Sequence, residues 1–162
     1  MIDRTPLWKP SKARIAAANL TAFMHSAERR WGVECADYDA LHRWSVTHPE
    51  QFWTTLWDFA GVVAEKRGER VLADANKMPG AKWFPDARLN FAENLLRYRD
   101  ERPALVSLLE NGARRELSYA ELYGQVAALA SSLRAHGVVA GDRVAGFLPN
   151  VAEAVIAMLA TT

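Results

Sequence analysis

Hydrophobic residues in the first third of the chain recur at the three- and four-residue spacing of a helix face. The first stripe consists of Leu20, Phe23, Met24, Ala27 and Trp31. This periodicity predicts one amphipathic helix that runs to about Trp31. Ser11 marks its start, because a serine hydroxyl can cap free backbone N–H groups. Gly32 marks its end, because glycine tolerates the left-handed conformation that closes a helix.

Two more helical patterns follow before residue 64. A short helix is predicted from Asp39 to Val46. The sequence Thr47-His48-Pro49-Glu50 has the spacing of a capping box with proline in the first turn, which predicts the start of another helix. The buried face predicted for that helix consists of Phe52, Trp53, Leu56, Phe59, Ala60 and Val63.

Turn and cap signals separate these helices from the second half of the chain. Met78-Pro79-Gly80 predicts a turn. Trp83-Phe84-Pro85 predicts an extended segment, because proline disfavours helical angles in the residue before it. Asn90 and Glu93 predict a capped short helix that continues through Leu96.

The second half alternates between strand and helix patterns. Residues 104–109 form an apolar run, and Asn111-Gly112 predicts a type I′ hairpin turn to a return strand at residues 114–117. A capping box at Ser118 and Glu121 predicts a helix that Gly137 ends. The apolar face of this helix consists of Leu122, Val126, Leu129 and Leu133.

A buried strand is predicted at Val144–Leu148, followed by a helix that Asn150 caps. That helix is expected to turn Val155, Met158 and Leu159 inward. Strand, helix, strand and helix in this order predict a right-handed βαβ unit after the hairpin, so the predicted fold class is α/β. The last residues contain no glycine, proline or charged stop signal, and we therefore expect the chain to be the opening part of a longer protein.

The composition restricts the partners of the chain. Half of the 162 residues are apolar and 24% are charged, which is typical of a globular protein with a core. The formal net charge is +1 without a run of Lys or Arg, so neither nucleic acid nor a membrane surface is expected as a partner. Cys35 is the only cysteine and no signal-like or membrane-spanning run occurs, which favours the cytoplasm.

Few residues suggest chemistry by their spacing. Cys35 and His42 could form a nucleophile and base, but a lone cysteine is more often a small buried side chain. The histidines have no metal-ligand spacing, and the glycines form no phosphate loop. Gly141 and Asp142 are interpreted as a turn. The four histidines are His25, His42, His48 and His136.

Tryptophan is frequent in the first half of the chain. The six tryptophans are Trp8, Trp31, Trp44, Trp53, Trp57 and Trp83. They could form a binding platform for a sugar or a partner protein, but the position of Trp53 on a helix face favours core packing. Trp57 lies off that face and is the best candidate for contact with another part of the molecule. The predicted stripes do not account for all of Trp44, Trp57 and Trp83, so we expect the first half to pack against a larger domain.

Three stretches resemble one family. The first comprises residues 6–11 (PLWKPS), 38–45 (YDALHRWS) and 49–53 (PEQFW), and the second is residues 82–96 (KWFPDARLNFAENLL). These two are similar to the N-terminal region of acetyl-CoA-synthetase-like enzymes, and they are closest to the acetoacetyl-CoA synthetase branch. The third stretch resembles the first core motif region of the wider adenylate-forming superfamily. It includes residues 117–122 (LSYAEL), 141–145 (GDRVA), 148–150 (LPN) and 153–158 (EAVIAM).

The resemblance implies an N-terminal extension at residues 1–67 and the truncated start of an AMP-binding adenylation domain at residues 68–162, with the change near Arg67-Gly68. It also implies a ligase that uses ATP, Mg²⁺ and CoA to convert a short acid, here acetoacetate, into its CoA thioester through an acyl-adenylate. The family's phosphate loop, ribose-binding aspartate and catalytic lysine have no counterpart in residues 1–162. We therefore assign no catalytic, cofactor-binding or metal-binding residue, and we expect the chain alone to be inactive.

Other interpretations stay open at this point. The substrate could be another short acid, as in the acetyl or propionyl enzymes. Alternatively, the chain could be a non-catalytic interaction module that uses its tryptophans, or a paralogue that has lost its catalytic part. The coding sequence after Thr162 would distinguish these cases, because a phosphate loop in the same frame supports the ligase.

Overall fold

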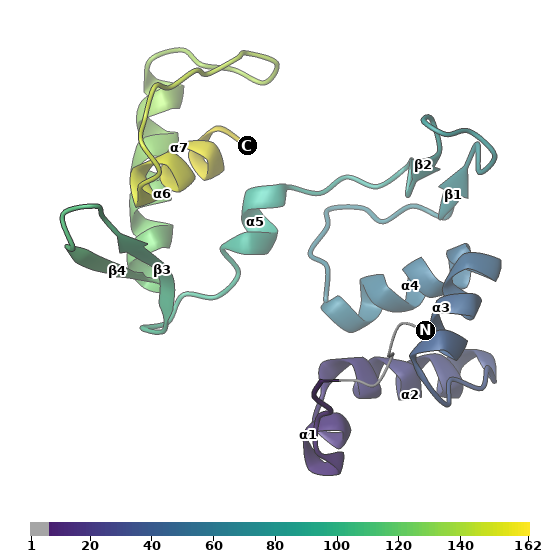
Figure 1. The fold of residues 1–162 in the computed structure, drawn as a ribbon. Helices are drawn as coiled ribbons and strands as arrows, with labels where there is room; N and C mark the ends of the chain where they lie inside the picture. Colours follow the sequence, from purple (N-terminus) through teal and green to yellow (C-terminus); the bar gives the residue numbers. More distant parts are fainter. Residues whose placement is uncertain (1–6) are drawn as a thin grey trace. The chain divides into compact units, whose positions relative to one another are not determined.

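The computed structural model describes residues 7–162, which divide into two compact units (Figure 1). The first unit comprises residues 7–62 together with residues 67–87. The second comprises residues 63–66 and 88–162. In the described part of the chain, no helix is long and apolar enough to cross a membrane.

The first unit contains four helices and a small hairpin. The helices are α1 (Lys12–Ala16), α2 (Asn19–Trp31), α3 (Tyr38–Thr47) and α4 (Pro49–Ala60). The hairpin pairs β1 (Leu72–Ala73) with β2 (Lys82–Trp83) in antiparallel fashion. The turn predicted at Met78-Pro79-Gly80 is confirmed and lies between these two strands.

The single helix predicted up to Trp31 is wrong, because the chain breaks into α1 and α2. Ala18 takes extended backbone angles, with φ −75° and ψ 140°. The Ile15 carbonyl at the end of α1 accepts hydrogen bonds from the Ala18 N–H and the Thr21 hydroxyl. These bonds satisfy a carbonyl that a continued helix would have used, so the break has little cost. The predicted ends at Ser11 and Gly32 are both confirmed.

The capping box predicted at residues 47–50 is also wrong. Thr47 is the last residue of α3, and its hydroxyl donates to the Arg43 carbonyl at 2.8 Å. His48 therefore stands at the N-cap of α4, and its imidazole contacts the Thr47 hydroxyl instead of capping the helix, although Pro49 occupies the first turn as predicted. The short helix predicted from Asp39 is confirmed as α3, and the Asp37 carboxylate caps it.

The core of the first unit lies between α2, α3 and α4. Its buried residues are Phe23, Ala27, Cys35, Leu41 and Trp44, with Phe52 and Leu56 packed against them. The predicted buried face of α4 is only partly confirmed, because Trp53 and Phe59 are exposed and Val63 lies beyond the helix. Thr55 is the buried residue of α4. Its hydroxyl accepts from the Trp31 indole N–H and donates to the Gln51 carbonyl.

Phe84 departs from the extended conformation predicted for the residue before Pro85. Its φ is 43°, in the left-handed region that a bulky side chain rarely adopts. The local hydrogen bonds explain this conformation. The Phe84 N–H donates to the Val71 carbonyl at 2.8 Å, and the Phe84 carbonyl accepts from the Ala87 N–H at 2.9 Å.

The second unit contains three helices and a hairpin. The helices are α5 (Phe91–Leu95), α6 (Tyr119–Ala135) and α7 (Ala152–Thr161), and the hairpin pairs β3 (Pro103–Leu108) with β4 (Arg114–Ser118). The caps predicted for α5 at Asn90 and for α6 at Ser118 and Glu121 are confirmed. The positive φ of Gly137 just beyond α6 agrees with its predicted role in ending that helix.

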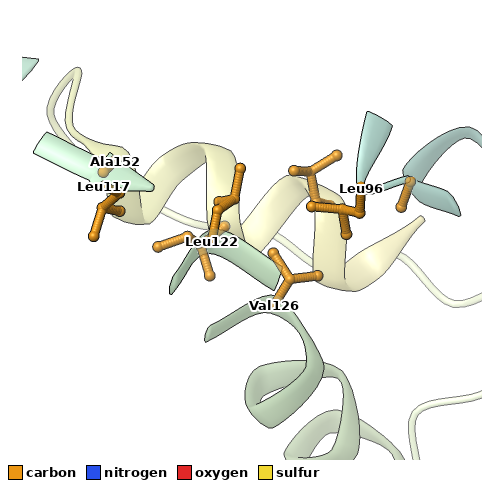
Figure 2. Close-up of a cluster of buried hydrophobic side chains, with 8 residues drawn as sticks. Leu96, Leu117, Leu122, Val126 and Ala152 are labelled. Atoms are coloured by element: carbon orange, nitrogen blue, oxygen red, sulfur yellow. The ribbon is translucent and has the colours of Figure 1, made fainter. Parts of the chain in front are cut away.

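The core of the second unit is aliphatic (Figure 2). Its buried residues come from α5 and its C-cap, β4, α6 and α7. They are Ala92, Leu96, Leu117, Leu122, Val126, Ala152, Ile156 and Leu159. Leu129 and Val155 pack against this cluster as predicted, whereas Met158 is exposed instead of inward.

The hairpin turn differs from the predicted type I′ turn. The Gly112 N–H donates to the Leu109 carbonyl at 2.9 Å, and the Leu109 N–H donates to the Ala113 carbonyl at 2.9 Å. Only Gly112 has positive φ here, at 79°, while the Asn111 side chain accepts from the Ala113 N–H. This pattern is typical of a type I turn followed by a glycine bulge, which needs one left-handed residue instead of two.

The predicted βαβ unit does not form. Residues 144–148 adopt neither helix nor strand, and both sheets in the described residues are two-stranded and antiparallel. A strand exists only when a neighbour supplies its hydrogen bonds, and no strand among residues 7–162 pairs with this segment. The cap predicted at Asn150 is wrong as well, because Val151 stands at the N-cap of α7 without a side-chain bond.

Candidate functional site

An apolar groove lies between α2, α3 and α4 of the first unit. Its volume is about 340 Å³. It is lined by Asn19, Leu20, Phe23, Tyr38, Leu41, His42, Ser45, Phe52, Leu56 and Phe59. The lining includes no carboxylate and no Lys or Arg, so the groove suits an apolar group and not the phosphates of a nucleotide.

Apart from Asn19 of α2, the polar side chains of this groove belong to α3. The rings of Tyr38 and His42 are stacked, with centroids 6.3 Å apart. The Ser45 hydroxyl donates to the His42 carbonyl at 2.8 Å, which is a bond within the helix. No acid or nucleophile is paired with the imidazole among the described contacts, so the groove offers no catalytic pair.

An arginine–aspartate–aromatic cluster fastens residues 67–87 to α4. The Asp58 carboxylate accepts from the guanidinium groups of Arg30 and Arg67. The Arg67 guanidinium lies 5.5 Å from the ring centroid of Trp57 and 5.7 Å from that of Phe84, and these two rings are 4.6 Å apart. Trp57 therefore contacts another segment of its own unit, which explains its position off the predicted face.

Trp44 and Trp83, which the predicted helix faces also left unexplained, have partners inside the first unit. Trp44 is 4% exposed, and its indole N–H donates to the Gln51 side-chain oxygen at 3.2 Å. Trp83 lies against Trp53, with ring centroids 5.3 Å apart. Trp53 is 39% exposed, so its predicted place in the core is wrong. The rings contact one another in pairs and do not form a flat platform.

Cys35 and His42 are not brought together. Cys35 is 3% exposed, and burial raises the pKa of its thiol, with the nearby Glu28 carboxylate adding to this effect. Glu28 itself accepts from the Cys35 N–H and pairs with His25 at 2.9 Å, and the hydrogen bond from His25 lowers the Glu28 pKa. No group of three His, Cys, Asp or Glu suited to a metal ion occurs among residues 7–162.

The perturbed carboxylates of the second unit lie on its surface in ion pairs. Glu153 lies at the start of α7, and a hydrogen bond from its own backbone N–H lowers the pKa of its carboxylate. A hydrogen bond from the Arg115 guanidinium adds to this lowering. The Arg102 guanidinium lowers the pKa of Asp100. Arg99 stacks on Tyr123, at 3.8 Å from the ring centroid. These contacts fix surface side chains, and none of them places an acid beside a base in a cavity.

A second groove, of about 400 Å³, lies between residues 144–148 and α7. It is lined by Val144, Ala145, Gly146, Leu148, Ala154, Ala157, Met158, Thr161 and Thr162. The sequence did not predict this groove, because the expected strand would place residues 144–148 inside a sheet. Asp142 lies just before it in a turn, where its carboxylate accepts from the Val139 N–H at 2.9 Å.

The comparisons with known proteins agree along the whole chain. A family model described as "Acetyl-coenzyme A synthetase N-terminus" matches residues 38–95, and one described as "AMP-binding enzyme" matches residues 91–162. The acetoacetyl-coenzyme A synthetase of Rhizobium meliloti (strain 1021) is 42% identical over 96% of this chain and 24% of its own length. The malonamoyl-CoA synthetase of Penicillium aethiopicum is 36% identical over 96% of this chain and 22% of its own.

A solved structure gives the same result. The acetoacetyl-CoA synthetase from Streptomyces lividans matches with a TM-score of 0.87 and 46% identity, over 97% of this chain and 25% of that chain. The chain thus spans about a quarter of the length of the relatives it matches.

These matches define the class of the protein as the AMP-binding superfamily. Within that superfamily, the chain is a homologue of the N-terminal part of the acetoacetyl-CoA synthetases.

Proposed function

We propose that this chain supplies the N-terminal part of an ATP-dependent acid–thiol ligase. In the complete reaction, the carboxylate of acetoacetate attacks the α-phosphorus of ATP, which releases pyrophosphate and leaves acetoacetyl-adenylate. The thiol of CoA then attacks the acyl carbon, loses its proton, and displaces AMP to give acetoacetyl-CoA. The observation that supports this proposal is the similarity over 96% of the chain to an acetoacetyl-coenzyme A synthetase.

Within this ligase, the chain acts as scaffold. No group of three His, Cys, Asp or Glu suited to a metal ion occurs among its described residues, and we assign no chemical step to them. ATP, Mg²⁺ and CoA would be held by residues outside the matched quarter. We further propose that residues 1–67 are an N-terminal extension and that residues 68–162 begin the adenylation domain. Two family models follow one another along the chain and support two successive parts, although these models meet at residues 91–95 and not at residue 67.

A cytoplasmic location is part of the proposal. Cys35 is buried and is the only cysteine of the chain, so it forms no internal disulfide, which suits a reducing compartment. Neither a nucleic acid nor a membrane enters the proposed reaction.

A chimeric enzyme tests the scaffold role. The matching N-terminal quarter of the Rhizobium meliloti relative is replaced by this chain, and pyrophosphate release is measured with acetoacetate, ATP, Mg²⁺ and CoA. We expect turnover by the chimera and only background release by the 162-residue chain alone. Turnover by the chain alone would overturn the scaffold role, and a folded but inactive chimera would count against the ligase assignment.

A second candidate is a ligase of the same class with a different short acid. The similarity of the chain to the malonamoyl-CoA synthetase from Penicillium aethiopicum supports this candidate. The in-frame coding sequence beyond residue 162 is the first observation to make. If it continues as a ligase, pyrophosphate release is compared for acetoacetate, malonamate, acetate and propionate on the longer protein, and the acid with the highest kcat/KM is the substrate.

The interaction-module alternative predicts a different result. A binding platform on the first unit would let acetoacetate, ATP or CoA quench the tryptophan fluorescence of the 162-residue chain. The ring pairs described above leave no such platform, so we expect no saturable quenching at sub-millimolar ligand. Saturable quenching would contradict the scaffold role of the first unit.

A further inference from the structure

Residues 67–87 carry the β1–β2 hairpin of the first unit and are bonded extensively to one another (Figure 1). The Arg70 guanidinium donates to both oxygens of the Asp86 carboxylate, at 2.9 and 2.6 Å. The Phe84 N–H donates to the Val71 carbonyl at 2.8 Å. None of these 21 residues is buried. The segment is therefore held together by its own hydrogen bonds and has no core of its own.

A segment of this kind depends on a support. β1 and β2 have two residues each, and an isolated hairpin of this size is at best marginally stable in water. The support is α4. The ring of Trp83 lies 5.3 Å from that of Trp53, and the ring of Phe84 lies 4.6 Å from that of Trp57. Trp53 and Trp57 are four residues apart and share one face of the helix. If the segment leaves this face, its own hydrogen bonds are expected to break as well.

Arg67 contacts both sides of the seam between the segment and α4. Its guanidinium donates to the Asp58 carboxylate of the helix at 2.8 Å. It also lies 5.5 Å from the ring centroid of Trp57 on the helix and 5.7 Å from that of Phe84 on the segment. One planar cation thus joins a carboxylate and a ring of α4 to a ring of the segment. This combination uses the flat guanidinium of arginine, which lysine lacks.

Arg30 provides a comparison within the same unit. It also donates to the Asp58 carboxylate, but it comes from α2 and lies 5.3 Å from the ring centroid of Trp31. The two arginines share one carboxylate and join different parts of the unit to α4. Loss of either one is therefore expected to loosen only the part that carries it.

We propose that residues 67–87 form a strap that opens from α4 and unfolds as one unit while α2, α3 and α4 stay packed, and that Arg67 holds this strap closed. Opening exposes the face of α4 that carries Trp53 and Trp57. The opening requires less free energy than unfolding of the whole unit, because the helices keep their own core. The proposal concerns contacts inside the first unit, so it does not depend on the ligase assignment.

Hydrogen exchange of the 162-residue chain in low urea concentrations, followed by NMR, is the first test. We expect the hydrogen-bonded N–H groups of Ala81 and Phe84 to exchange through one common opening, and those in the middle of α2 and α4 to exchange through a rarer one. Exchange of the strap and the helices through the same opening would overturn the proposal. Unrelated openings for Ala81 and Phe84 would overturn it as well.

Arg67→Gln tests the residue that holds the strap, and Arg30→Gln is the matched control, because each removes one guanidinium from Asp58. We expect Arg67→Gln to accelerate exchange at Ala81 and Phe84 about tenfold, since a half-exposed ion pair and two cation–π contacts are lost together. Arg30→Gln should leave this exchange unchanged. No acceleration in Arg67→Gln, or equal acceleration in both variants, would overturn the role of Arg67.

Cys35 reports whether the helices stay packed when the strap opens. It is the only cysteine of the chain, is 3% exposed and belongs to the core between α2, α3 and α4. A water-soluble thiol reagent therefore reaches it only when that core opens. We expect Arg67→Gln to react at the wild-type rate although its strap exchanges faster. Faster labelling of Cys35 in this variant, including immediate labelling of a chain that fails to fold, would show that Arg67 supports the whole unit and would overturn the proposal.

Discussion

The two units bury their apolar residues in different ways. The first packs aromatic rings from helices and from the β1–β2 hairpin, with edge-to-face pairs such as Phe23 with Phe52 and Trp44 with Phe52. The second packs aliphatic side chains and leaves Val144, Phe147 and Leu148 outside its core. The first unit therefore pairs many of its rings with one another, although Trp8 and Trp53 stay exposed, whereas the second leaves an apolar segment exposed to solvent.

The difference follows from the hydrogen bonding of helices and strands. A helix pairs its backbone groups within one segment, so α2, α3 and α4 form their own packed group. A strand needs a neighbour, and residues 144–148 have none in the described chain. We infer that the first unit is the more independent folding unit, and the predictions below test that difference.

The largest expected effect is at Trp44 in the first unit. Trp44→Ala removes a ring that is 4% exposed and contacts Phe52, so we expect it to lower the free energy of unfolding by about 3–5 kcal/mol. Urea unfolding followed by tryptophan fluorescence measures this loss.

The signal reports the first unit alone, because all six tryptophans lie in it. Trp53→Ala, at a 39% exposed position, is the control. An equal loss in both variants would show that burial does not govern this cluster.

Gly68 should be the next most sensitive position. Its φ is 77°, and a Cβ there would lie 2.5 Å from the Asp86 Cβ, which Arg70 holds through two hydrogen bonds. We expect Gly68→Ala to cost about 3 kcal/mol, because a clash is added to left-handed strain. Gly32→Ala is the control that adds left-handed backbone strain without a clash, because Gly32 has a φ of 66° and no atom lies within 4 Å of a Cβ built there. It should cost about 1 kcal/mol in the same fluorescence assay. A Gly32→Ala loss as large as that of Gly68→Ala would rule out the clash.

The hairpin of the second unit should respond more weakly. Gly112→Val forces a β-branched residue to φ 79° in open space, and we expect a loss of roughly 1–3 kcal/mol. His42→Ala, on the exposed rim of the first groove, should be nearly neutral. Urea unfolding is followed by far-UV circular dichroism, which reports both units. A loss for His42→Ala that equals or exceeds that for Gly112→Val would refute this ranking and would point to a role for the imidazole.

Local signals in the sequence predicted the ends of most elements. Ser11, Asn90 and the Ser118–Glu121 box act within one helical turn, so their effect does not depend on the rest of the fold. The helix break at Ala18 could not be predicted in this way. It depends on the Thr21 hydroxyl, which reaches back to the Ile15 carbonyl only after the two helices have separated.

The prediction failed where an element needs a distant partner. The apolar run at residues 144–148 is typical of a buried strand, but periodicity does not show whether a neighbouring strand exists. The second groove was missed for the same reason. The absence of a catalytic residue in the chain stays a prediction, because it rests on motifs. The contact of Trp57 with Phe84 was predicted only as contact with another part of the molecule.

The smallest expected effect is electrostatic and lies at the start of the hairpin in the second unit. The Arg102 guanidinium donates to both oxygens of the Asp100 carboxylate, at 2.8–3.1 Å, and holds the pKa of Asp100 below its ordinary value of 3.8. Because the folded pKa is lowered, the ionised carboxylate stabilises the fold above the ordinary pKa. This contribution is lost as the pH falls through the lowered value.

Asp100→Asn should therefore lower the free energy of unfolding slightly at neutral pH, and its difference from the wild type should vanish in acid below the lowered pKa. Both partners are exposed, so solvent screening keeps the effect small and added salt should reduce it further. Urea unfolding by far-UV circular dichroism over a pH series measures the difference. Glu101→Gln, at the neighbouring exposed position with no described ion pair, is the control and should show a smaller difference at neutral pH. A difference for Asp100→Asn that grows as the pH falls would show that the Asp100–Arg102 pair does not stabilise this unit.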